Sequence, residues 1–121
     1  MGLSSLLKNI AETQELHSVQ ALRSRYYKAN YANVKAQVLK YAEQDKMNVK
    51  NVDDVHKEIL LQSNRYHIIV SIVQVSPIET SVDFKIEMYA MIGWGKPQKK
   101  LIEFYQFLDQ NLQFKGVGLH P

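Results

Sequence analysis

The sequence predicts an α+β fold, a two-layer sandwich in which an antiparallel four- to five-stranded meander carries helices from both ends of the chain on one face. Apolar and polar residues alternate from Val82 to Ala90, which is the pattern of a strand with one solvated face. The run from Tyr66 to Val75 is apolar at both alternating sets of positions and rich in β-branched residues, which indicates an interior strand. Apolar residues at helical spacing stand on both sides of these two runs.

The composition is that of an ordinary globular domain, with 45% hydrophobic and 22% charged residues in a chain of 121. The sequence has no cysteine, which excludes a disulfide framework and a cysteine nucleophile and suggests a reducing cytoplasm. A net charge of +3 gives little reason to expect nucleic acid as a partner. Since no apolar run reaches about eighteen residues, we expect no membrane span.

The first residues predict an amphipathic helix within 1–12, because Leu3, Leu6, Leu7 and Ile10 recur at helical spacing. A helix of this length is marginal alone, so we expect it to dock on the sheet or on a second copy of the chain. A helix lying on a membrane surface is the alternative, although more Lys and Arg would be expected on its polar side. Residues 13–20 are predicted to be a connector, 21–115 the single α+β domain, and 116–121 a C-terminal tail.

The segment from Ala21 to Lys28 contains an aromatic pair and predicts a short strand. Its basic residues are typical of an edge strand that is kept soluble by charge. The same residues could form a platform for single-stranded nucleic acid, where aromatic rings stack on bases and cations bind phosphates. That less favoured platform would consist of Arg23, Arg25, Tyr26, Tyr27, Lys28 and Tyr31.

Asn30 is a plausible N-cap for a helix that runs to about Gln44. Weak alternation over 47–52 and again over 57–63 predicts two more antiparallel strands, joined by a turn at Asp53-Asp54. Pro77 sets the turn between the two central strands.

Pro97 suits the first turn of the last helix. The predicted inward residues of that helix are Leu101, Phe104, Tyr105, Leu108 and Leu112. Gly116 and Gly118 are expected to end regular structure.

This order of elements resembles a family of small bacterial cytosolic proteins of unknown function. The resemblance is carried by the segment Leu22-Arg23-Ser24-Arg25-Tyr26-Tyr27-Lys28, by the strand meander and by the glycine-rich joint before the last helix. It covers most of the chain after about Ala21 and implies a helix, strand-meander and helix fold in a bacterial cytoplasm. It implies no activity.

The histidines offer no metal site, because His17, His56, His67 and His120 lack the spacing of metal ligands. His56 lies near Asp53 and Asp54, where a solvated turn is a better explanation than acid–base chemistry. Asp83 and Glu87 share the predicted wet face of a strand and are expected to keep the sheet soluble. We therefore predict no catalytic residue, no metal and no cofactor.

The joint before the last helix departs from a local rule, because lysines crowd a helix start where acidic residues are favoured. Free backbone N–H groups, flexible glycines and lysines together suit a phosphate or carboxylate group, so this joint is a candidate anion site beside the plainer interpretation as a turn. The candidate residues are Gly93, Trp94, Gly95, Lys96, Lys99 and Lys100.

A second candidate is an apolar ligand cavity between the last helix and the sheet, lined by Phe84, Ile86, Met88, Phe104 and Leu108. The same residues would equally fill a core. The leading functional hypothesis is a non-enzymatic cytoplasmic domain that acts by contact with another protein or by self-association. The alternative is a small-ligand binder that uses the cavity or the anion site.

Overall fold

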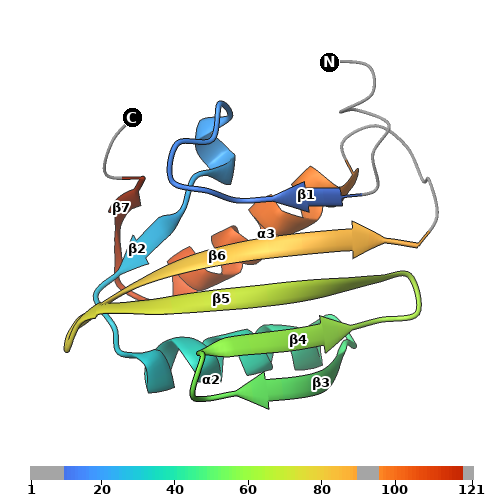
Figure 1. The fold of residues 1–121 in the computed structure, drawn as a ribbon, viewed down its shortest axis with the longest axis horizontal. Coiled ribbons are helices and arrows are strands. Elements are labelled where there is room, and N and C mark those ends of the chain that lie inside the picture. Colours follow the sequence, from blue (N-terminus) through green and yellow to red (C-terminus); the bar gives the residue numbers. More distant parts are fainter. Residues whose placement is uncertain (1–9, 90–95, 119–121) are drawn as a thin grey trace.

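The computed structural model describes residues 10–89 and 96–118 and shows a seven-stranded antiparallel sheet with two α-helices (Figure 1). The strands lie in the order β3-β4-β5-β6-β2-β7, and β1 pairs with β6. The strands are β1 (Ile10–Glu12), β2 (Arg25–Tyr27), β3 (Asn48–Asp53), β4 (Glu58–Gln62), β5 (Tyr66–Ser76), β6 (Glu79–Met88) and β7 (Phe114–Val117). The helices are α2 (Tyr31–Gln44), α3 (Lys96–Asn111) and a short 3-10 turn, η1 (Gln20–Leu22).

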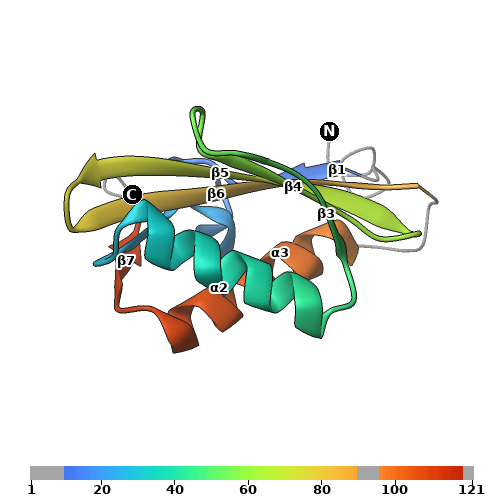
Figure 2. The same cartoon turned by 90° about the horizontal axis from the view of Figure 1, so that it is seen from below.

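Both α-helices lie on the same side of the sheet, so the molecule has two layers (Figure 2). The predicted α+β class is confirmed, and β3 to β6 form the predicted antiparallel meander. The sheet is larger than the predicted four to five strands, because β1, β2 and β7 extend it beyond β6.

Strand β6 lies at the centre of this arrangement. It pairs with β5 along its whole length on one side, and on the other side with β2 at one end and β1 at the other. Its alternation divides the side chains between the two faces as the sequence predicts, and those beneath the helices are Val82, Phe84, Ile86 and Met88. Strand β5 buries only one of its two apolar sets, since Val73 and Val75 are 56% and 52% exposed.

Aromatic stacking joins the two layers. The ring of Phe84 on β6 stacks on Phe104 of α3 at 4.3 Å, and Phe104 stacks on Tyr41 of α2 at 4.2 Å. The predicted inward face of α3 is buried at Leu101 and Leu108 as well. Helix α2 begins as predicted, because the Asn30 side chain accepts a hydrogen bond from the Asn33 backbone N–H.

The prediction of a helix within residues 1–12 is wrong at its C-terminal end, where residues 10–12 form β1; residues 1–9 lie outside the described part of the chain. Strand β2 covers β6 only from Thr80 to Val82, and β1 pairs with β6 from Lys85 to Glu87. Exposed backbone N–H and C=O groups of β6 favour pairing with another strand, which accounts for the strand at residues 10–12.

The predictions of an edge strand at Ala21–Lys28 and of a tail from residue 116 are also wrong. Strand β2 lies between β6 and β7, so it is internal, and Gly116 and Val117 belong to β7. Gly118 continues this pairing, since its N–H donates to the Ser24 carbonyl at 2.8 Å. A Cβ atom at Gly118 would lie 2.3 Å from the Glu15 carbonyl oxygen, so the chain needs glycine there to approach.

We predict that Phe104→Ala lowers the free energy of unfolding by about 3–5 kcal/mol, because it removes the ring that contacts both Phe84 and Tyr41. Denaturant unfolding would measure the change. The control is Gln106→Ala at an exposed position of the same helix, which should change stability by less than about 0.5 kcal/mol. A loss of similar size in both variants would contradict this account of the core.

Candidate functional site

The face of the sheet opposite the helices carries an apolar centre. Leu60 on β4 and Ile69 on β5 are directly paired across the two strands and point to this face. Three shallow hollows of about 280, 190 and 290 Å³ lie on it, and Ile69 lines all three. The hollows therefore form one continuous open face, centred on Ile69, which we call the open face.

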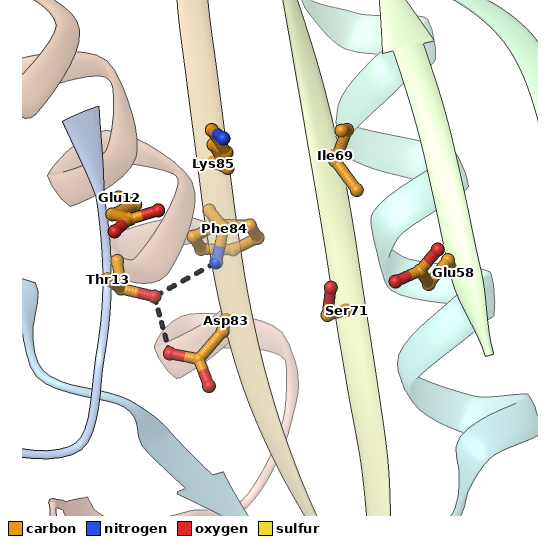
Figure 3. Close-up of a pocket in the computed structure, with 8 residues that line it drawn as sticks. All are labelled: Glu12, Thr13, Glu58, Ile69, Ser71, Asp83, Phe84 and Lys85. Atoms are coloured by element: carbon orange, nitrogen blue, oxygen red, sulfur yellow. Dashed lines mark hydrogen bonds between the residues drawn. The ribbon is translucent and has the colours of Figure 1, made fainter. Parts of the chain in front are cut away.

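Carboxylates surround this centre. Glu12 of β1, Glu58 of β4 and Asp83 of β6 line the first hollow together with Lys85 (Figure 3). Glu87 follows Lys85 on the same side of β6. The open face thus gathers four carboxyl groups around one lysine, although the whole chain carries a net charge of +3.

A polar cluster limits one end of the open face. The Tyr89 hydroxyl accepts a hydrogen bond from Gln62 Nε2 at 2.9 Å and lies 3.2 Å from His67 Nδ1. His67 Nε2 lies 3.7 Å from a carboxylate oxygen of Glu87. These contacts hold the half-exposed Tyr89 ring beside the hollow that Ile69 and Leu60 line.

Asp83 lies at the opposite end of the open face. It stands on β6 between the stretch that pairs with β2 and the stretch that pairs with β1. Its Oδ1 atom lies 2.6 Å from Thr13 Oγ1 and 2.7 Å from Ser24 Oγ (Figure 3 shows the first contact). Burial raises the pKa of the Asp83 carboxyl, the hydroxyls of Thr13 and Ser24 oppose that shift, and nearby Glu15 and Glu12 add to it. Asp83 thus lies on the predicted face of β6, but its carboxyl is engaged by two hydroxyls and partly buried.

The predicted anion-site residues do not share one environment in the structure. Gly93, Trp94 and Gly95 lie outside the described residues, whereas Lys96 and Lys99 are exposed at the start of α3. Lys100 forms an ion pair with Asp45 and lies 5.6 Å from the ring centroids of both Tyr41 and Tyr66. Since its charge already has a carboxylate partner, Lys100 is poorly suited to hold a free anion. The anion site stays a prediction.

The predicted cavity residues do come together. Phe84, Ile86, Met88, Phe104 and Leu108 are all buried in one core cluster between the sheet and the helices. The Phe84 and Phe104 rings are in stacking contact, so they occupy the space directly between β6 and α3. This packing is that of a core.

The aromatic pair at the start of the domain is engaged within the protein. Tyr26 and Tyr27 are 8% and 0% exposed, and their hydroxyls donate to the carboxylates of Glu15 and Asp109. Arg25 forms an ion pair with the same Asp109. Buried rings cannot stack on bases, so Tyr26 and Tyr27 are not available for such a platform.

The histidines that the structure describes do not converge. Within residues 10–89 and 96–118 no group of three His, Asp or Glu side chains could hold a metal ion, and His120 lies outside these ranges. His56 contacts Asp53 at 2.8 Å in an exposed turn, where the Asp53 carboxylate raises the pKa of His56. This turn matches the solvated interpretation, because Asp53 also accepts from the backbone N–H groups of Val55 and His56.

Comparisons with protein-family models, with curated proteins and with solved structures found no match for this chain. Among the described helices, none has the length and apolar character needed to cross a membrane. With no related protein to compare, the candidate site is identified from the side chains of the open face alone.

We predict that Lys100→Gln lowers the free energy of unfolding by about 1–3 kcal/mol, because Asp45 would keep its charge without its ion-pair partner. Lys96→Gln and Lys99→Gln are matched controls in the same helix turn and should change stability by less than about 0.5 kcal/mol. Thermal or urea unfolding would compare the three variants. Equal, negligible effects would support the sequence-based view that all three lysines are mismatched to the helix start.

Proposed function

We propose that this protein is a non-enzymatic contact protein whose open face binds a basic segment of another protein that also bears apolar side chains. The observation that carries the proposal is the arrangement around Ile69, where an apolar centre with three adjoining hollows is surrounded by carboxylates. Apolar side chains of a partner would cover Leu60 and Ile69. Its Lys or Arg side chains would pair with the surrounding carboxylates of Glu12, Glu58 and Glu87, which we call the acidic rim.

Charge argues for a partner other than a second copy of the open face. Two such faces brought together would bring the carboxylates of Glu12, Glu58 and Glu87 on one copy near those on the other, and like charges across an interface are unfavourable. The helix layer has the opposite character, since α2 and α3 carry five lysines and three acidic residues. The acidic rim would also repel nucleic acid.

The proposal continues the sequence-based hypothesis of a non-enzymatic domain that acts by contact. A cytoplasmic location is in keeping with a chain that has no cysteine. The proposal requires no catalytic step, since an apolar centre with a charged rim is typical of a recognition surface.

Binding can be tested with a labelled synthetic peptide in which Lys and Leu alternate, measured by fluorescence anisotropy at two salt concentrations. We expect binding that weakens as salt rises, and none by matched peptides with Glu in place of Lys or Ser in place of Leu. Glu58→Lys and Ile69→Ser should each weaken binding several-fold, because they remove a rim charge and the apolar centre.

Two control variants make the same chemical changes elsewhere. Glu43→Lys reverses a charge on the exposed side of α2, and Val55→Ser removes an apolar side chain that is 83% exposed at the β3–β4 turn. Neither should alter binding. The proposal fails if wild-type protein ignores the Lys-Leu peptide, or if sedimentation shows a dimer that Ile69→Ser dissociates, since a second copy would then occupy the open face.

A further inference from the structure

The junction beside Asp83 joins four segments through side-chain oxygens. Thr13 follows β1, Ser24 precedes β2, Asp83 lies on β6 and Tyr105 lies on α3. The Tyr105 hydroxyl lies 3.0 Å from Thr13 Oγ1 and 2.6 Å from the Val82 carbonyl oxygen. Thr13, Ser24 and Tyr105 are all buried.

The hydrogens at this junction can be counted. There are four close oxygen–oxygen contacts: Thr13 with Asp83, Ser24 with Asp83, Tyr105 with Thr13, and Tyr105 with the Val82 carbonyl. Each of the three hydroxyls supplies one hydrogen, so an ionised Asp83 leaves one of the four contacts without any. In the ionised state the hydroxyls of Thr13 and Ser24 both turn toward the carboxylate, and Tyr105 has a single hydrogen for two neighbours.

A proton on Asp83 satisfies every contact. Asp83 then donates to Thr13, Thr13 donates to Tyr105, and Tyr105 donates to the Val82 carbonyl, while Ser24 donates to Asp83. Thr13 Oγ1 also accepts from the Phe84 backbone N–H at 2.9 Å, which completes its two acceptor positions. Two backbone bonds close the same junction, from Thr13 N–H to the Phe84 carbonyl and from Ser24 N–H to the Gln14 carbonyl.

We propose that Asp83 is a proton-dependent latch, which as a neutral acid fastens residues 10–24 to β6 and α3 and releases them when it ionises. The proton stays on Asp83 at pH values where exposed carboxyls have already lost theirs. This inference concerns the internal junction and is independent of whether the open face binds a partner.

The charges around Asp83 favour the neutral acid. Glu12 of β1 and Glu15 of the following loop both oppose another negative charge on Asp83, and Glu58 of β4 lines the same hollow. Two nearby cations have the opposite effect and favour the ionised carboxylate. Lys85 lines the same hollow two positions along β6, and Arg25 of β2 lies over the Tyr105 ring at 5.0 Å but pairs with Asp109.

The direction of the pH effect follows from this balance. Because the folded state holds the proton more tightly than the unfolded chain, the stabilisation is complete below the ordinary Asp pKa of about 3.9 and is lost as pH rises through the raised pKa. Rising pH should therefore loosen the junction at the end of β1, which forms one margin of the open face.

The first test follows the Asp83 carboxyl carbon by NMR in the intact wild-type protein as pH is raised. The latch predicts a midpoint clearly above about 3.9. A midpoint below that value would overturn it, because an ordinary carboxylate that accepts two hydroxyl hydrogen bonds is easier to ionise.

The second test compares wild type with Asp83→Asn, whose amide donates to Thr13 at every pH. Above the wild-type midpoint, the variant should melt higher by at least about 3 °C. Amide exchange at Thr13, Gln14 and Ser24 should become faster in wild type than in the variant, by up to about tenfold per pH unit. The comparison at equal pH cancels the intrinsic pH dependence of exchange.

Glu43→Gln is the control, because it neutralises an exposed carboxylate of α2 that belongs neither to the junction nor to the open face. It should keep the wild-type pH profile. The latch is contradicted if Asp83→Asn is destabilised by the same amount at every pH, or if exchange at the junction keeps a constant ratio between wild type and variant. Should Asp83→Asn fail to fold, the wild-type NMR midpoint decides the question alone.

Discussion

The stack of Phe84 between β6 and the helices is the contact on which the rest of the structure depends. Its ring meets Phe104, which in turn meets Tyr41, so one strand and both α-helices share a single aromatic column. Because period-2 alternation assigns each β6 side chain to one face, placing Phe84 under α3 places Asp83 and Lys85 on the other. Both α-helices therefore lie on the same side, and neither of them covers the open face.

The two sides of the molecule also differ in charge, and this difference links the structure to the proposed function. Lysines on α2 and α3 contribute to the basic excess of the chain, whereas carboxylates gather around Ile69 on the open face. Such an asymmetry specifies which partners are repelled as well as which are attracted. At the junction the same acidic surroundings act on Asp83, so the chemistry of the open face and the protonation of the latch have a common electrostatic origin.

The sequence could predict features with local causes. The alternation of β6, the Asn30 cap of α2 and the inward stripe of α3 each depend on neighbours within one element, and the structure confirms them. Sequence patterns did not predict the features that depend on residues far apart in the chain. Residues 10–12 and 114–117 are strands because β6 and β2 offer backbone groups to pair with.

The candidate site was missed for the same reason. The second apolar set of β5, with Ile69 at its centre, was visible in the sequence but indicated a strand buried on both faces. Thr13 and Ser24 contact Asp83 across 70 and 59 residues, and no local pattern announces such partners.

One-sided cover of the sheet can be tested directly with two adjacent residues of β5, because the natural chain has no cysteine. Ile69→Cys and Val70→Cys would each carry a single thiol, and the rate of its reaction with a thiol reagent would be compared with the rate in denaturant. The account predicts that the thiol at 69 reacts in the folded protein, and that the thiol at 70, beneath the helices, reacts only through unfolding. Equal rates at the two positions, or a protected thiol at 69, would contradict it.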